Sequence, residues 1–205
     1  MYPNAGVILD SNGNLFGTTV EGGLYGFGTV FELIYNINSG WTETVLYNFQ
    51  NLSDGQWPYA GLVSDSAGNL YGATSDGGAG GGGTLFELSS VGDSWTFTLL
   101  YSFSGQQGKY CGPRASLSMD NSGSLYGTTL CDGANNLGNV FKLANIQNGW
   151  EYTSLYDFIG GPDGAGPVSN VTFDTNNNLF GTAGTGGNGS CNPPHGCGTV
   201  WMIKP

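Results

Sequence analysis

The chain has 205 residues, of which four are basic and fifteen acidic, and its formal net charge at pH 7 is -11. Such a surface repels polyanions, so nucleic acid and anionic membrane are excluded as partners, and no apolar run is long enough for membrane insertion. Charged residues make up only 9% of the sequence while glycine contributes 38 residues, and together with the many Asn, Ser and Thr residues this composition predicts an all-β protein.

Four copies of one pattern fill the chain. They begin at Asp10, Asp65, Asp120 and Asp174, and the copy from Asp65 reads DSAGNLYGATSDGGAGGGGTLFEL. A period of about 55 residues is typical of repeat architectures. We therefore expect one domain over residues 1–205 that consists of four units, with approximate bounds 3–57, 58–112, 113–166 and 167–205.

Each unit begins with a proline and a short alternating run, for example residues 116–119, which predicts a half-buried strand. A tetrapeptide such as DSNG at residues 10–13 then supplies turn residues that lead into a second strand, for example residues 70–74. The glycine in the middle of this second strand permits close approach of a neighbouring strand.

A glycine-rich loop leads to a third strand, such as residues 84–88, and a short connection leads to a fourth strand that opens with Trp41, Trp95 or Trp150. In residues 95–103 aromatic and leucine side chains on one face alternate with mainly polar ones, which indicates a strand packed on another sheet. Four antiparallel strands per repeat predict the blade of a β-propeller, and a β-sandwich or a solenoid is the competing architecture.

The fourth unit ends with GTVWMIKP and lacks the strand that begins with tryptophan. Three explanations remain open: a three-stranded last blade, a fragment of a longer repeat array, or cover of the open edge by another copy. An uncovered strand edge invites pairing, so self-association through the last blade is one expectation. The predicted fold is a β-propeller of four blades, each four-stranded except the last.

Alternating strand directions place the tight turns on one face of the predicted disc and the long, irregular loops on the other. Binding residues usually lie on loops that a rigid scaffold holds. We therefore expect the binding surface on this long-loop face, which is formed by residues 22–28, 50–59, 77–83, 104–112, 131–138 and 185–198.

The four cysteines lie in the third and fourth units, and the sequence has no C-x-x-C pair to suggest a metal site. Cys111 precedes the first strand of its unit and Cys131 follows the second, so a hairpin brings them side by side. A disulfide there closes a loop of about 20 residues and contributes roughly 3 kcal/mol. Cys191 and Cys197 bracket NPPHG and are expected to close a small knuckle. Paired disulfides predict an oxidising setting, outside the cell or at its surface.

The repeated sequences GNLFGTTVEGGLYGFGTVFEL, GNLYGATSDGGAGGGGTLFEL and GSLYGTTLCDGANNLGNVFKL resemble the GloVer repeats of bacterial extracellular tandem-repeat proteins. Their DxxGNL(F/Y)G core is also similar to the propeller repeats in the sensor regions of some two-component regulators. The resemblance covers nearly all the chain. It implies a secreted or surface-displayed protein and transfers no catalytic residues.

The four repeated aspartates allow two interpretations. Asp, Asn and backbone carbonyls are suitable Ca²⁺ ligands. However, the same carboxylates close hairpin turns by bonding their own backbone, and the DSNGN type of sequence lacks the distal glutamate of a calcium loop. The turn is the preferred interpretation, and neither a metal nor another cofactor is expected.

Two further acids and the single histidine are the remaining candidates for chemistry. Glu21 and Asp76 occupy equivalent places after the second strand of their units, where they suit the acid and base of a glycosidase or hydrogen bonds to sugar hydroxyls. His195 lies between prolines and a cysteine, and no acid or nucleophile lies beside it in the sequence. A nucleophilic triad is therefore not expected.

Trp57, Tyr59, Tyr110 and Tyr25 lie in long loops and do not recur in every unit, unlike the aromatic residues that pack the blades. Exposed rings beside Asp, Asn and Gly suit the stacking and hydroxyl bonding that sugars require. Arg114 follows Tyr110 closely in the sequence and can receive an anionic group.

The sequence thus predicts a non-catalytic extracellular binding module that recognises a glycan or a surface protein through the long-loop face. One alternative is a structural, self-assembling surface repeat protein, and another is a polysaccharide-degrading enzyme that uses loop carboxylates. The candidate ligand-binding residues are Trp57, Tyr59, Tyr110, Arg114, Glu21, Asp76, Tyr25 and His195.

Overall fold

The computed structural model describes residues 2–92, 94–105, 110–147, 149–189 and 196–204, which form short strands in four sheets. A short 3-10 helix, Gly161–Asp163, precedes the strands of unit 4. The strands of units 1 to 4 are, in order, β1 (Ile8–Leu9), β2 (Leu15–Thr19), β3 (Thr29–Asn36) and β4 (Gly40–Asn48); β5 (Val63–Ser64), β6 (Leu70–Thr74), β7 (Thr84–Val91) and β8 (Ser94–Ser102); β9 (Ser118–Met119), β10 (Leu125–Thr129), β11 (Asn139–Ile146) and β12 (Gly149–Asp157); β13 (Ala165–Pro167), β14 (Thr172–Phe173), β15 (Leu179–Thr185) and β16 (Thr199–Ile203).

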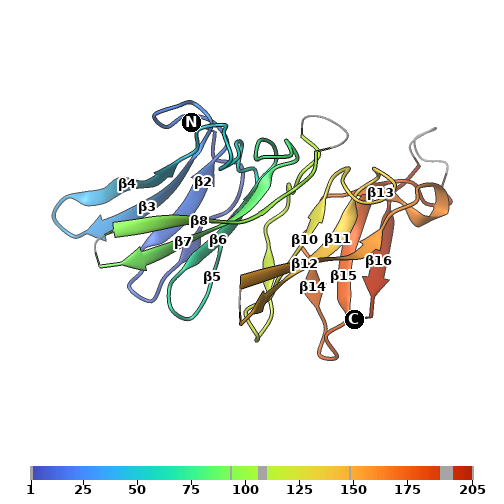
Figure 1. Ribbon diagram of the computed structural model, residues 1–205. Coiled ribbons are helices and arrows are strands. Elements are labelled where there is room, and N and C mark those ends of the chain that lie inside the picture. Colours follow the sequence, from blue (N-terminus) through green and yellow to red (C-terminus); the bar gives the residue numbers. More distant parts are fainter. Residues whose placement is uncertain (1, 93, 106–109, 148, 190–195, 205) are drawn as a thin grey trace.

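In units 1 to 3 the four strands are antiparallel neighbours in chain order, as a propeller blade requires. Figure 1 shows the four sheets following one another from the blue N-terminal side to the red C-terminal side, so that units 1 and 4 lie at opposite ends of the row. The predicted β-propeller with four antiparallel blades is confirmed.

Unit 4 differs from the other units in the number of strands across its sheet. β14 pairs with the first half of β15 and β13 with the second half, whereas β16 pairs along the opposite edge of β15. This sheet is therefore three strands wide, and within the described residues no strand pairs with the outer edge of β16. The prediction that the last blade lacks its fourth strand is confirmed.

The aspartate turns have the hydrogen bonds that the sequence predicts. Asp65 Oδ1 accepts bonds from the backbone N–H groups of Ala67 and Asn69, both at 2.9 Å, and Oδ2 accepts from Asn69 Nδ2 at 2.8 Å and Tyr71 Oη at 3.1 Å. Both carboxylate oxygens are thus engaged by the turn itself. The corresponding backbone bonds recur at Asp10, Asp120 and Asp174.

These turns should make the stability of the protein sensitive to acid. Burial alone would raise the pKa of Asp65, but the bonds from Asn69, Tyr71 and Ala67 outweigh it and lower the pKa, and the pKa values of Asp120 and Asp174 are lowered as well. A carboxyl with a depressed folded-state pKa stabilises the fold at pH values above its unfolded value of about 3.9, and the stabilisation is lost as the pH falls through the folded value.

We therefore expect the urea midpoint of unfolding to fall between about pH 5 and about pH 3, and to fall less in the triple variant Asp65→Asn, Asp120→Asn, Asp174→Asn. Urea titrations at both pH values, followed by circular dichroism, measure this difference. An equally steep fall in the triple variant would contradict the role assigned to the turns.

Hydrophobic packing joins neighbouring sheets. Between units 1 and 2 the rings of Tyr47 and Phe97 stack with centroids 4.3 Å apart, and between units 2 and 3 Tyr101 and Tyr152 stack at 4.2 Å. Burying a large apolar side chain contributes about 1.5–3 kcal/mol, so adjacent blades stabilise each other. Each unit that has a fourth strand also buries the phenylalanine that follows it, namely Phe49, Phe103 and Phe158.

The glycine in each second strand lies against a side chain of the neighbouring strand. A Cβ atom on Gly72 would lie 2.4 Å from Cζ of Phe86, which is its cross-strand partner in β7. Gly17 and Gly127 have the same relation to Phe31 and Phe141, each at 2.6 Å. The close neighbour is thus a ring of the paired strand.

Candidate functional site

Four of the predicted ligand-binding residues come together on the long-loop face. The rings of Trp57 and Tyr110 stack with centroids 4.8 Å apart and an interplanar angle of 9°. The guanidinium carbon of Arg114 lies 5.3 Å from the ring centroid of Tyr59 and 5.8 Å from that of Tyr110. We call Trp57, Tyr59, Tyr110 and Arg114 the Trp57 cluster. It joins the loops that precede units 2 and 3.

Both stacked residues have a backbone conformation that large side chains rarely adopt. The φ angles of Trp57 and Tyr110 are 56° and 71°, in the left-handed region. Glycine occupies the corresponding positions before units 2 and 4, where Gly55 and Gly164 have φ angles of 90° and 96°. Non-glycine residues in this region cost about 1–3 kcal/mol each and concentrate at functional sites. The chain therefore carries an aromatic ring where sister units carry an unstrained glycine.

Hydrogen bonds and a disulfide hold the two strained residues. The N–H of Trp57 donates to the carbonyl of Phe27 at 3.0 Å, and its carbonyl accepts from the N–H of Tyr59 at 2.9 Å and from both the N–H and the hydroxyl of Ser75. Tyr110 immediately precedes Cys111, which is bonded to Cys131 with the two Cα atoms 4.7 Å apart. The predicted pairing of these cysteines is confirmed, and it fixes the chain beside the cluster.

The Trp57 cluster presents both apolar and polar groups to solvent. Tyr110 is 39% exposed, and Trp57, Tyr59 and Arg114 are half-buried. Arg114 Nε is buried and has no hydrogen-bond partner among the described residues. Aromatic rings that are partly open to solvent, next to a half-buried guanidinium, suit a ligand that has both a flat C–H face and oxygen acceptors.

The two predicted acids lie in different environments. Gln56 and Asp76 form the cross-strand pair of unit 2 that corresponds to Cys111 and Cys131 in unit 3. Asp76 is only 4% exposed and its Oδ1 accepts the N–H of Gly77 at 2.7 Å, whereas Glu21 is exposed. Because Asp76 is enclosed by the chain, this pair does not present two carboxylates to a polysaccharide.

The remaining predicted residues do not join the cluster. Tyr25 is 49% exposed on the loop between β2 and β3. His195 and Cys191 lie outside the described residues. Cys197 is disulfide-bonded.

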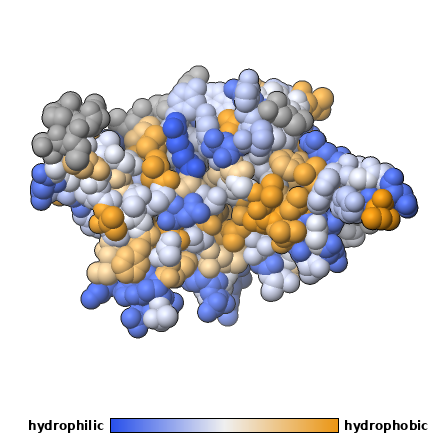
Figure 2. Space-filling view, turned by 180° about the vertical axis from the view of Figure 1, so that it is seen from behind, coloured by the Kyte–Doolittle hydropathy of each residue, from blue (hydrophilic) through white to orange (hydrophobic). Residues whose placement is uncertain are grey.

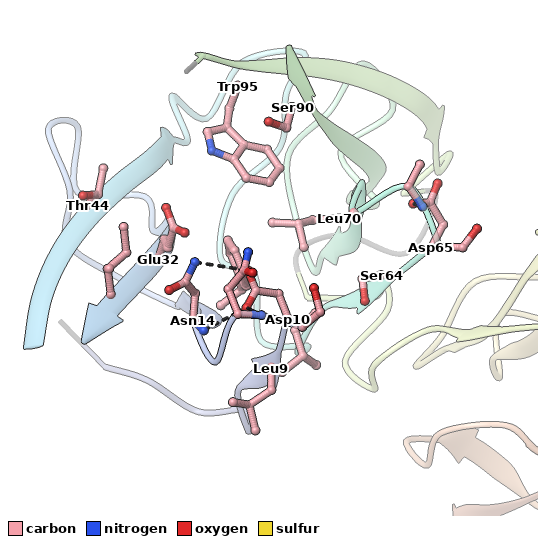
Figure 3. Close-up of a pocket in the computed structure, with 18 of the residues that line it drawn as sticks. Leu9, Asp10, Asn14, Glu32, Thr44, Ser64, Asp65, Leu70, Ser90 and Trp95 are labelled. Atoms are coloured by element: carbon pink, nitrogen blue, oxygen red, sulfur yellow. Dashed lines mark hydrogen bonds between the residues drawn. The ribbon is translucent and has the colours of Figure 1, made fainter. Parts of the chain in front are cut away.

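A cavity of about 930 Å³ lies between units 1 and 2 on the opposite, tight-turn face. Figure 3 shows Asp10, Asn14 and Glu32 of unit 1 on one side of it and Trp95 and other residues of unit 2 on the other. Burial and the nearby Asp10 carboxylate raise the pKa of Glu32. Within the described residues no three His, Cys, Asp or Glu side chains lie close enough together to hold a metal ion.

The repeat pattern does not predict this cavity, although one difference between units indicates it. In unit 2 the hydroxyl of Tyr71 donates to Asp65 at 3.1 Å or to Glu87 at 3.3 Å. Unit 1 has Phe16 in the place of Tyr71, so Asp10 and Glu32 lack this hydroxyl, and Asp10 Oδ2 accepts a bond from Asn14 Nδ2 at 3.1 Å instead. Trp95 packs edge-on against Phe16 with centroids 5.9 Å apart, which accounts for this tryptophan as packing between blades.

The comparisons with known proteins agree with the fold. A model of the Gloeobacter/Verrucomicrobia repeat matches residues 2–205, whereas no curated protein matches the chain. Among solved structures the chain is similar to a "putative oxidoreductase (glucose dehydrogenase)" from Thermus thermophilus, with a TM-score of 0.59 and 13% identity over 100% of this chain and 62% of the other.

Two further solved structures match more weakly. A protein of unknown function from Dyadobacter fermentans has a TM-score of 0.49 and 15% identity over 86% of this chain and 60% of its own. A "putative 6-phosphogluconolactonase" from Bacteroides fragilis has a TM-score of 0.44 and 12% identity over 93% and 55%. The chain therefore spans less than two thirds of each structure, and at these identities the likeness concerns the fold alone.

Among the described residues no helix has the length and apolar character to cross a membrane.

Proposed function

The chain belongs to the Gloeobacter/Verrucomicrobia repeat family, and we propose that it is a non-catalytic binding module, outside the cell, that recognises a glycan through the Trp57 cluster. The observation that carries this proposal is the stacked pair of Trp57 and Tyr110, each held at a positive φ angle. Two strained aromatic residues in contact are difficult to explain by stability, because glycine at those positions removes the strain.

A sugar ring fits the chemistry of this surface. Its C–H face packs on an aromatic ring, and its hydroxyl or carboxylate oxygens accept hydrogen bonds from Arg114. The acidic protein, with its net charge of -11, disfavours nucleic acid at the same place. The Cys111–Cys131 disulfide fits an oxidising environment outside the cytoplasm.

A binding role is better supported than a catalytic one. The structural neighbour from Thermus thermophilus is described as a putative oxidoreductase, but a likeness at 13% identity supports only the shared fold. The enzyme alternative used Glu21 and Asp76 as acid and base, and the burial of Asp76 argues against it. The structural, self-assembling alternative depends on surfaces outside the Trp57 cluster and is compatible with glycan binding.

Retention of the purified chain on an array of plant, microbial and soil polysaccharides tests the proposal. We expect selective retention that is lost in the double variant Trp57→Gly, Tyr110→Gly and kept in Tyr35→Ala, a matched control because Tyr35 is an exposed ring on β3. A calcium chelator should have no effect, since the turn carboxylates are engaged by their own backbone. No retention on any polysaccharide, or unchanged retention in the double variant, would contradict the proposal.

A further inference from the structure

One position of the third strand is buried in every unit except the last. Val30, Leu85 and Val140 are all 0% exposed, because each lies against the next unit, whereas Val200 at the same position in unit 4 is 80% exposed. Phe180, which corresponds to the buried Phe16 of unit 1, is half-buried. We call this outer side of unit 4, with Phe180, Val200 and Met202, the C-face.

The complementary side of a blade is covered in units 2 to 4 and open in unit 1. Leu62, Leu117 and Val171 are at most 4% exposed, while Val7 at the same position in unit 1 is 47% exposed. Trp41 is 52% exposed on the same sheet. We call this side of unit 1, with Val7, Leu15, Phe31, Leu33 and Trp41, the N-face.

The three internal junctions show which surfaces fit together, because the outer side of each of units 1 to 3 packs on the facing side of the unit that follows. The hydrophobic clusters of the described residues join units 1 with 2, 2 with 3 and 3 with 4, and none joins unit 4 with unit 1. Figure 2 shows apolar side chains, in orange, gathered in patches on both halves of the molecule. The C-face and the N-face thus have the same apolar pattern as two surfaces that bind each other.

The C-face and the N-face differ from the other units at positions that would meet. At the internal junctions Tyr47 stacks on Phe97 and Tyr101 on Tyr152. Among the described residues of unit 4 no strand carries the tyrosine, and unit 1 has Glu43 in the place of Phe97 and Tyr152. The C-face therefore lacks the tyrosine of this pair, and the N-face lacks its aromatic partner. No unpaired ring of this kind remains where the two faces meet.

We propose that the C-face of one copy of this chain binds the N-face of a second copy. Trp95 packs on Phe16 and Trp150 on Tyr71, with centroids 5.9 Å apart in both pairs, and Trp41 of the second copy packs on Phe180 in the same way. Val200 lies against the second copy's Val7 and Phe31. A contact between two different surfaces is heterologous, so it builds a ring or a filament from identical chains.

Sedimentation velocity of the full chain over a range of concentrations tests this contact. Val200→Asp disrupts the C-face and Val7→Asp disrupts the N-face, and both positions are exposed enough for the fold to tolerate aspartate, which circular dichroism verifies. Val91→Asp is the matched control, because Val91 is 69% exposed at the end of β7 and belongs to neither face.

We expect the wild type and Val91→Asp to assemble as the concentration rises, and each face variant alone to stay monomeric. An equimolar mixture of the two face variants should form dimers, because one intact C-face then meets one intact N-face. Three results would overturn the proposal: a wild type that stays monomeric at every soluble concentration, assembly of either face variant alone, or no dimers in the mixture. None of these results depends on a glycan, so the test is independent of the proposed function.

Discussion

Replacing Tyr110 with glycine is expected to weaken glycan binding about thirtyfold while the free energy of unfolding stays within about 1 kcal/mol of the wild-type value. The ring supplies half of the stacked pair with Trp57, and the loss of such an anchor costs about 2 kcal/mol of binding. Glycine also removes the strain of a φ angle of 71°, and this gain offsets the lost stacking of about 0.5–1.5 kcal/mol.

Tyr110→Ala separates the two effects, because alanine removes the ring and keeps the strained backbone. We expect it to bind as weakly as Tyr110→Gly but to be less stable than that variant by about 1 kcal/mol. Urea unfolding and calorimetric titration with the retained polysaccharide measure the two quantities. If the glycine variant were the less stable of the two, the strain assigned to Tyr110 would be wrong.

Removing the Cys111–Cys131 disulfide is expected to lower the free energy of unfolding by about 3 kcal/mol, because the bond closes a loop with a sequence separation of 20 residues. The double variant Cys111→Ser, Cys131→Ser leaves no unpaired thiol at this position. We also expect weaker glycan binding, since Tyr110 is then held less firmly next to its stacking partner. Urea unfolding under oxidising conditions measures the loss, and an unchanged midpoint would contradict it.

The fold was predictable because each unit repeats the same local signals. The Asp turn at Asp65, the alternation after Trp95 and the cysteine pair each imply a strand connection, and four copies in register leave few arrangements. The missing fourth strand of unit 4 was visible for the same reason. The identity of the residue that faces the second-strand glycine was not, since the register of the paired strand decides that Phe86 faces Gly72.

The candidate site was predictable only in part. Trp57 and Tyr110 could be predicted as site residues because they do not recur in every unit. An alignment of the units also shows that glycine takes the place of Tyr110 twice, at Gly55 and Gly164. That signal indicates the positive φ angle without a structure. By contrast, the loop path that leaves Tyr25 outside the Trp57 cluster has no local signature.

The cavity next to Trp95 was missed because it depends on packing between two units. In the sequence the cavity is indicated only by Phe16, which replaces the tyrosine of unit 2, together with the acid Glu32 on the paired strand. Within a single unit, Phe16 and Tyr71 are both aromatic residues at the same position of the second strand. Only the junction of two blades shows that Asp10 and Glu32, which lack this hydroxyl, line a cavity.

The central claim is that a glycan binds at the Trp57 cluster and not in the cavity on the opposite face. The indole N–H signals of Trp57 and Trp95 report on the two places, and Trp57→Phe and Trp95→Phe assign them in a two-dimensional NMR spectrum. On titration with an oligosaccharide from the retained polysaccharide, we expect the Trp57 signal to shift and the Trp95 signal to stay in place. A shift of Trp95 with an unchanged Trp57 would contradict the claim and move the site to the tight-turn face.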